Sequence, residues 1–186
     1  MIERDIKKMR NDIDKMERNL QEVGDDVIYM KRLIKRCLVE DTDILRALHN
    51  PDIDLDSPDD FLDKNIYGFL RIPETQDVAK NFICFTVDDI EDHRFNEAMK
   101  IQHIQFNCIC HLDEMKTEYG IDRHDLLGYL IRDIFNWTNR FGLQFKLIYN
   151  KEGSMDSDYY CRTLKFEATK VNHLNKARMD NSKWQA

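Results

Sequence analysis

Two cysteines and two histidines lie within nine residues of each other, a combination that could bind zinc. The motif is Cys108-x-Cys110, with His103 before it and His111 directly after it. Structural zinc requires four nitrogen or sulfur ligands that converge on the ion, and cysteine pairs usually supply them as C-x-x-C motifs in loops. The residues around this motif alternate as in a β-strand, which places the cysteines on one face and the histidines on the other. The spacing therefore predicts cysteines buried in a core and no metal site here.

A cluster of acidic residues follows the first predicted strand and could serve a different chemistry. It consists of Asp88, Asp89, Glu91 and Asp92, followed by Arg94. Carboxylates near the end of a strand can hold a divalent metal ion for phosphodiester hydrolysis, so a nuclease that uses Asp88, Asp89 and Asp92 is one alternative. Magnesium-dependent DNA cleavage that Asp89→Asn abolishes would support it. Only Arg94 is near enough in sequence to hold a phosphate, so we interpret the segment as a solvent-exposed loop and a candidate interaction surface.

A second acidic segment, residues 50–63, contains six aspartates and no basic residue. Its D-x-D-x-D spacing is similar to that of a calcium-binding loop, but such a loop needs glycine at its sixth position and glutamate at its twelfth. The chain has Ser57 and Asp63 there, so we predict an acidic surface loop. Common phosphate-binding and hydrolase motifs are absent from the sequence. We therefore expect no catalytic residue, no metal ion and no cofactor, and we interpret His124, at the start of a predicted helix, as a surface or helix-terminus residue.

The composition indicates one globular domain with an appendage, because 42% of the 186 residues are hydrophobic and 34% are charged. The net charge of −7 disfavours nucleic-acid binding, which requires a cationic surface. Five cysteines are an odd number in a chain without an export signal, which indicates reduced thiols. No hydrophobic run is long enough to cross a membrane, so we expect a protein that stays in the cytoplasm and does not bind membranes.

The first 24 residues form a separate segment with a heptad pattern. Hydrophobic residues recur at alternating spacings of four and three, and Gly24 follows as a signal that ends the helix. Such a helix must bury its hydrophobic stripe against the body of the protein, a second copy or another protein, and the sequence leaves these options open. We predict that this heptad stripe is an interaction surface made of Ile2, Ile6, Met9, Ile13, Met16 and Leu20.

Charges in the heptad stripe should weaken assembly and leave the monomer folded, if this helix docks between proteins. The change Ile6→Asp together with Ile13→Asp places two carboxylates in the hydrophobic contact. Light scattering would measure the loss of the assembly, and circular dichroism would measure the fold of the monomer. Loss of folding in the isolated monomer would contradict this prediction, because it would place the helix in the protein's own core.

Helical periodicity in the rest of the chain predicts three helices. Two of them are expected at residues 26–39 and 42–49. The third is a long amphipathic helix that begins at Asp122 and ends before Gly142. Trp137 falls near the hydrophobic stripe of this long helix, so we expect it to pack inside the protein.

Hydrophobic and polar residues alternate in four further segments, which predicts β-strands. Together, the helices and strands indicate an α+β domain at residues 25–171, followed by a polar tail at residues 172–186. The fold is expected to be a small, mostly antiparallel sheet of about four to five strands packed by the long amphipathic helix, with an N-terminal helical region. The strands are expected at residues 82–87, 104–112, 143–149 and 159–168. The predicted core consists of Phe85, Ile104, Phe106, Cys108, Cys110, Leu130, Ile134, Phe145, Leu147, Leu164 and Phe166.

The order of these elements resembles that of the tail terminator family of long-tailed bacteriophages, whose members form a ring that closes the tail tube and joins it to the head. Three segments carry the resemblance, which spans roughly residues 27–172. The first is NFICFTVDDIEDHRFNEAMKIQHIQFNCICHLDE, a two-strand unit with a long charged connection. The second is IDRHDLLGYLIRDIFNW, a helix packed on the sheet, and the third is LQFKLIYNKEGSMDSDYYCRTLKFEAT, a closing hairpin.

This resemblance implies a structural, non-enzymatic virion protein of the phage neck. It would form an oligomeric, hexameric ring that joins the head connector to the tail tube and lets DNA pass without specific binding. The implied partners are further copies of the chain, the connector or head-completion protein and the tail tube protein, with assembly in the host cytoplasm. Two alternatives stay open: a head-closure or connector-adaptor protein, and a cytoplasmic coiled-coil interaction module that forms dimers or trimers.

Overall fold

The computed structural model describes residues 27–71, 81–93 and 96–171. The predicted heptad helix at residues 1–24 and the polar tail at residues 172–186 lie outside the described residues. The described part confirms the predicted α+β fold class, since it contains three α-helices and a five-stranded, mostly antiparallel sheet. None of the described helices is both long and apolar enough to cross a membrane.

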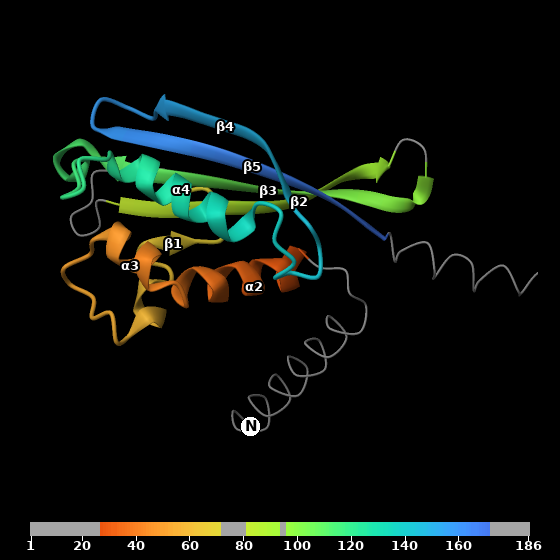
Figure 1. Ribbon diagram of the computed structural model, residues 1–186, viewed down its shortest axis with the longest axis horizontal. Coiled ribbons are helices and arrows are strands. Elements are labelled where there is room, and N and C mark those ends of the chain that lie inside the picture. Colours follow the sequence, from red (N-terminus) through yellow and green to blue (C-terminus); the bar gives the residue numbers. More distant parts are fainter. Residues whose placement is uncertain (1–26, 72–80, 94–95, 172–186) are drawn as a thin grey trace, which may run out of the picture.

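The sheet has the strand order β1-β2-β3-β5-β4 (Figure 1). The two-residue strand β1 runs parallel to β2, and every other neighbouring pair is antiparallel. The central strand β3 pairs with both β2 and β5, so its alternating side chains form the middle of both faces. The strands are β1 at Ile66–Tyr67, β2 at Asn81–His93, β3 at Asn96–His111, β4 at Lys146–Ser154 and β5 at Tyr159–Val171.

The helices cover one face of this sheet. Helix α2 packs against β2, while α4 packs against β3 and β5 and also contacts α3. The carboxylate of Asp41 accepts hydrogen bonds from the backbone amides of Asp43 and Ile44, which fixes the start of α3. The helices are α2 at Val27–Val39, α3 at Thr42–Leu48 and α4 at Arg123–Phe135, with short 3-10 turns at Pro58–Phe61 and Leu112–Glu114.

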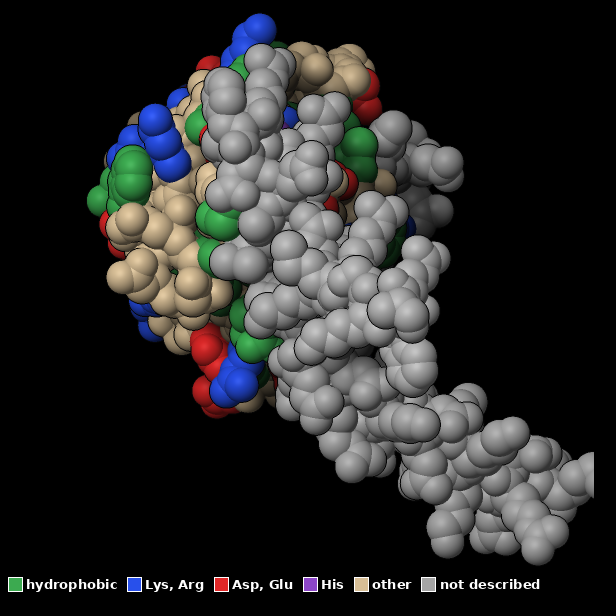
Figure 2. All heavy atoms as spheres, turned by 90° about the vertical axis from the view of Figure 1, so that its right-hand side faces the viewer, with side chains coloured by type: hydrophobic (Ala, Val, Ile, Leu, Met, Phe, Trp, Pro, Cys, Tyr) green, Lys and Arg blue, Asp and Glu red, His purple; other side chains and the backbone are tan. Residues whose placement is uncertain are grey.

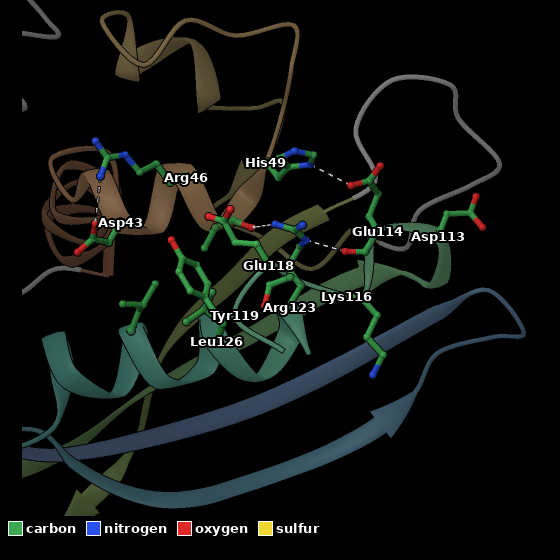
Figure 3. A pocket seen from close by; sticks show the side chains of 13 residues that line it. Asp43, Arg46, His49, Asp113, Glu114, Lys116, Glu118, Tyr119, Arg123 and Leu126 are labelled. Atoms are coloured by element: carbon green, nitrogen blue, oxygen red, sulfur yellow. Dashed lines mark hydrogen bonds and ion pairs between the residues drawn. The ribbon is translucent and has the colours of Figure 1, made fainter. Parts of the chain in front are cut away.

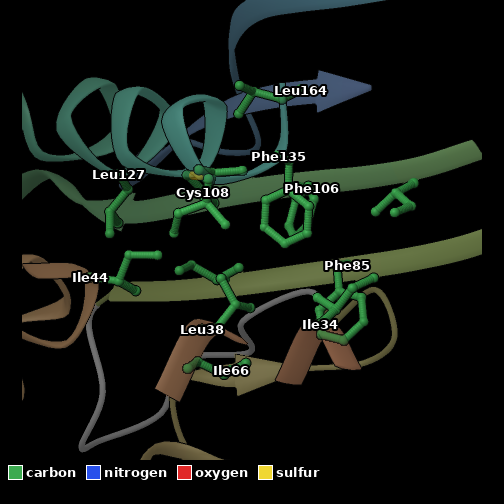
Figure 4. Packing of buried hydrophobic residues seen from close by; sticks show 14 of the residues in the cluster. Ile34, Leu38, Ile44, Ile66, Phe85, Phe106, Cys108, Leu127, Phe135 and Leu164 are labelled. Atoms are coloured by element: carbon green, nitrogen blue, oxygen red, sulfur yellow. The ribbon is translucent and has the colours of Figure 1, made fainter. Parts of the chain in front are cut away.

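The main hydrophobic core lies between these helices and the sheet (Figure 4). Phe106 of β3 lies at its centre, with ring centroids 4.6 Å from Phe135, 5.8 Å from Phe85 and 5.9 Å from Phe166. Nine of the eleven residues predicted for the core are buried. The other two, Leu130 and Leu147, pack against the cluster and are partly buried.

The connection between β2 and β3 differs from the sequence prediction of a long charged loop. Residues 88–93 continue β2, and strand pairs run from Asp88 opposite His103 to His93 opposite Asn96. We call this hairpin segment the arm; Figure 1 shows it extending beyond the helices. A ladder of backbone hydrogen bonds does not depend on side-chain polarity, and a strand without a covered face needs no hydrophobic alternation. The polar sequence therefore indicated a loop where the chain forms strands.

The end of α4 also differs from the prediction. The helix ends at Phe135, and Trp137 is exposed rather than packed inside. Trp137 has a left-handed backbone φ of 60° and donates its backbone N–H to the carbonyl of Phe145 over 2.7 Å. This bond turns the chain toward β4 and directs the large side chain outward.

Candidate interaction surface

Only some of the predicted interaction residues lie in the part of the chain that the structure describes. The six residues of the heptad stripe and Arg94 lie outside the described residues. Glu91 and Asp92 lie in β2, but their side chains are outside the described part of the chain. Asp88 and Asp89 are described, and both lie at the start of the arm. The described candidate interaction surfaces are therefore the base of the arm and the edges of the sheet.

Asp88 and Asp89 lie on opposite faces of the sheet, because successive side chains of a strand alternate. Asp88 is exposed and accepts a hydrogen bond from the Thr86 hydroxyl over 3.3 Å. Asp89 faces the same side as Gln102 and Lys100. Two of the three carboxylates of the nuclease alternative therefore point away from each other and do not share a ligand position.

Asp89 is the centre of a partly buried charge cluster, which we call the arm-base cluster. Lys100 Nζ donates to Asp89 Oδ2 over 2.6 Å, and Gln102 Nε2 donates to Oδ1 over 2.8 Å. Lys170 Nζ lies 3.3 Å from Oδ1. The side chains of Lys100 and Lys170 are only 7% and 8% exposed. One carboxylate of β2 thus binds two buried ammonium groups, from β3 and from β5, and links three strands.

The environment of Asp89 keeps its carboxylate ionised. Partial burial by itself would raise its pKa, but the hydrogen bonds from Lys100 and Gln102 and the charge of Lys170 outweigh burial and lower the pKa below its usual value. Both carboxylate oxygens already have cationic or amide partners. The arm-base cluster therefore stabilises the sheet rather than presenting a free ligand.

The cysteine and histidine motif is separated by the sheet. Cys108 and Cys110 are fully buried in the main core, and burial raises the pKa of the Cys108 thiol well above its usual value. On the other face of the sheet, Cys84 is also buried, and burial raises its pKa to about 11. His103 Nε2 lies 3.0 Å from Glu167 Oε2, away from the main core. The motif's cysteine sulfurs and histidine nitrogens thus do not surround a common point.

Within the described part of the chain, the two edges of the sheet have no neighbouring strand over much of their length. On one side, β1 covers β2 only opposite Ile83 and Cys84. Among the described residues, the rest of the outer edge of β2, including the arm, has no strand beside it. On the other side, β4 is the last strand and is exposed along most of its length. Open edges carry unpaired backbone N–H and C=O groups that a strand from another chain can bind.

The β4 edge also exposes large hydrophobic side chains. Ile148 is 43% exposed and Tyr149 is 46% exposed. The register of β4 against β5 shifts between Leu147 and Tyr149, which places a β-bulge at Ile148. The same strand also carries the exposed charges of Lys146, Lys151 and Glu152, so Ile148 and Tyr149 form a small hydrophobic surface between charged residues. An exposed hydrophobic pair on an edge strand is a candidate protein contact.

A cavity of about 720 Å³ lies between α3, the segment after β3 and the start of α4 (Figure 3). Arg123 is buried beside it and donates to the carbonyls of Ala47 and Glu114 over 2.7 and 2.6 Å. His49 Nδ1 lies 2.9 Å from Glu114 Oε2. The cavity is lined by both acidic and basic side chains, namely Asp43, Arg46, Asp113, Glu114, Lys116, Glu118 and Arg123. Similar numbers of acidic and basic groups favour neither an anion nor a cation, so we assign the cavity no ligand.

The described surface at the end that carries the arm is also mixed in charge. Figure 2 shows Lys and Arg side chains close to Asp and Glu side chains there, with hydrophobic side chains between them. The described atoms in this view form no broad cationic patch. This agrees with the net charge of −7, which disfavours adhesion to DNA phosphates.

Sequence reasoning placed one residue of α4 wrongly. His124 was expected at the surface or at a helix terminus; it lies in the first turn of α4, but only 2% of it is exposed. Its side chain lies against Met115 on one side and near Asp125 and Glu152 on the other. In the sequence, the adjacent pair of His124 and Asp125 was the only local sign of this cluster. Glu152 belongs to β4 and approaches His124 only in the folded protein.

The comparisons with known proteins concern most of the described domain. The family model YomW matches residues 41–168, which run from the first cap residue of α3 into β5. A comparison with curated proteins found no match. The family match spans more than half of the 186 residues. The chain therefore belongs to the YomW family, a phage-associated family.

Proposed function

We propose that this protein is a structural virion protein of a phage neck, similar to a tail terminator, that forms a hexameric ring between the head connector and the tail tube. Its partners are further copies of the chain, the connector or head-completion protein and the tail tube protein, and it is assembled in the host cytoplasm. Membership of a phage-associated family supports the phage part of this proposal. The single observation that supports the ring is the pair of unlike open sheet edges.

The two edges have the properties of a head-to-tail contact. The arm edge of β2 is rich in carboxylates, whereas the β4 edge exposes Ile148 and Tyr149. When one edge of a subunit pairs with the unlike edge of the next, the two subunits contribute different patches to the contact. A contact between two different patches repeats around an axis and closes into a ring when the rotation allows it. Backbone pairing between the edges would continue one sheet into the next subunit.

The charge of the chain suits a ring through which DNA moves. At −7 per chain, six copies present an excess of carboxylates over ammonium and guanidinium groups. Carboxylates repel DNA phosphates, which lets the genome pass without adhering to the wall. This proposal therefore needs no base-specific or phosphate-specific contact.

Placing two lysines on the β4 edge should dissociate the ring and leave the subunit folded. The variant is Ile148→Lys with Tyr149→Lys, and both side chains are already exposed, so the free energy of unfolding should change by no more than about 1 kcal/mol. Lysines on an edge strand prevent another strand from pairing there. Light scattering of the wild-type chain should give about 134 kDa, six times 22.3 kDa, and the variant should give the mass of one subunit.

The matched control is a second exposed Ile-Tyr pair, on α2. Ile28 and Tyr29 are 47% and 40% exposed, so Ile28→Lys with Tyr29→Lys adds the same charges elsewhere and should leave the hexamer intact. A β4-edge variant that stays hexameric would reject the edge contact. A wild-type dimer or trimer that persists with a tail tube protein, and is lost when residues 1–24 are removed, would favour the coiled-coil interaction module.

A further inference from the structure

The start of α4 contains a buried histidine with one unsatisfied nitrogen. The His124 side chain is 3% exposed, and its Nε2 makes no hydrogen bond within the described structure. Nε2 lies 3.4 Å from Asp125 Oδ1 and 3.4 Å from Glu152 Oε1. Among the described residues, this is the group of His, Cys, Asp and Glu side chains close enough to hold one metal ion. A buried imidazole nitrogen is thus directed at two carboxylates.

The other ring nitrogen determines which tautomer the neutral histidine has. His124 Nδ1 lies 3.0 Å from Met115 Sδ. A thioether sulfur accepts hydrogen bonds and cannot donate them, so Nδ1 must carry the hydrogen. In the neutral ring Nε2 then has a lone pair, which is the form that binds metal ions. A lone pair that faces two carboxylates is repulsive unless a cation lies between them.

Arg162 holds one of the two carboxylates, that of Asp125, in place. Arg162 Nη1 donates to Asp125 Oδ1, and Arg162 Nε donates to Asn150 Oδ1 over 2.9 Å. Gly128 leaves room for this arginine, since a Cβ at that position would lie 2.9 Å from Arg162 Cδ. The hydrogen bond from Arg162 orients the Asp125 carboxylate, and a metal ion would share Oδ1 with Arg162. The site is therefore built from α4, β4 and β5 together.

We propose that His124 Nε2, Asp125 Oδ1 and Glu152 Oε1 form a binding site for a divalent transition metal ion such as Zn²⁺. Ligands about 2.0–2.2 Å from a tetrahedral zinc ion lie roughly 3.3–3.6 Å from each other, which matches the two 3.4 Å separations. One nitrogen and two carboxylate oxygens suit zinc and its neighbours in the first transition series.

The metal site borders solvent, because the side chains of Asp125 and Glu152 are 39% and 56% exposed. A small cavity of about 180 Å³, lined in part by Asp125 and Arg162, lies next to it between α4 and the β4–β5 hairpin. Glu152 itself is 56% exposed, so an ion can reach the site without opening the core. Three protein ligands and an open fourth position leave room for a water molecule on the ion. Binding would tie the first turn of α4 to strand β4.

The test uses the full-length protein, stripped of metal with a chelator and then titrated with ZnCl₂ and, separately, with CoCl₂. Calorimetry should show one ion per chain. Bound Co²⁺ should give the visible absorption of a tetrahedral nitrogen and oxygen site, without the near-ultraviolet band of thiolate ligands. At a free zinc concentration about 100-fold above the dissociation constant, the melting temperature should rise by roughly 5–10 °C.

The decisive variant is Glu152→Gln, which removes an exposed ligand and leaves the buried histidine intact. It should weaken zinc binding by at least about tenfold. Glu118→Gln, which neutralises an exposed glutamate in the 112–122 segment, is the control and should bind zinc like the wild type. Absence of zinc and cobalt binding in the folded protein would overturn the proposal and leave the approach of His124 to the two carboxylates as a structural contact only. Binding that Glu152→Gln does not change, or that shows a thiolate band, would overturn it as well.

Discussion

The change Asp89→Ala is expected to lower the free energy of unfolding by about 3 kcal/mol, because it removes a carboxylate that contacts two buried ammonium groups. The side chains of Lys100 and Lys170 are 7% and 8% exposed, so water has little access to the place that the Asp89 carboxylate would leave. Truncating one partner of a buried charge cluster is more harmful than removing the whole cluster. Urea denaturation of the purified protein measures this loss through the midpoint and slope of the transition.

The adjacent aspartate provides the control for this variant. Asp88 is exposed on the opposite face and accepts one hydrogen bond, from Thr86, so Asp88→Ala should change the free energy of unfolding by no more than about 0.5 kcal/mol. Equal effects of the two alanine variants would show that Asp89 does not stabilise the arm base in solution.

Acid provides a second readout of the same contact. The folded-state pKa of Asp89 lies below its usual value, so the unfolded chain binds the proton more tightly. The stabilisation is therefore fully present above the unfolded pKa of about 3.9 and is lost as the pH falls through the folded pKa. The difference in stability between wild type and Asp89→Ala should shrink below about pH 4, and a difference that grows in acid would contradict the sign of this shift.

The change Phe106→Ala is expected to cost about 3–5 kcal/mol, since it removes a fully buried ring from the centre of the core. Phe106 contacts three other aromatic rings, Phe85, Phe135 and Phe166, which come from β2, α4 and β5. These rings are held by different elements and cannot all move into the space, so a cavity remains. Urea denaturation would measure the loss, and near-ultraviolet circular dichroism would show whether the aromatic packing has loosened.

An exposed aromatic residue of α4 is the control for the core variant. Tyr129 is 56% exposed, and its ring lies 5.4 Å from the Arg132 guanidinium carbon. Tyr129→Ala should therefore change the free energy of unfolding by no more than about 1 kcal/mol. A Phe106→Ala variant as stable as this control would mean that the core collapses around the smaller side chain.

The local elements of the body could be predicted from the sequence, because each depends on the period of its own hydrophobic residues. The spacing in residues 26–39 and 42–49 predicted α2 and α3 within a few residues of their ends. Alternation around Cys108 and Cys110 placed these side chains on the inner face of β3 without any knowledge of the fold. The α+β class follows from the order of such elements along the chain.

The contacts between elements could not be predicted in this way. The polar arm has no hydrophobic period, so its strands are determined by backbone pairing across the hairpin, which a sequence pattern does not report. Lys170 reaches Asp89 because β5 lies beside β3 in the sheet. From the sequence alone, Asp89 has the same pattern of polar neighbours as a residue of an exposed loop.

The clearest division between sequence and tertiary structure is at His124. Its position at the start of α4 follows from the sequence, as does the neighbouring Asp125. Its burial and the approach of Glu152 are decided by the sheet order, which places β4 beside β5 and brings a distant carboxylate to the helix start. Local periodicity determines which face of an element is hydrophobic, but the juxtaposition of polar groups depends on long-range strand pairing. For this protein the sequence by itself determined α2, α3, the start of α4 and the inner face of the sheet, because each depends on local periodicity and capping. Only the tertiary structure decided the end of α4, the arm, the arm-base cluster and the histidine-carboxylate site, because these depend on contacts between distant segments.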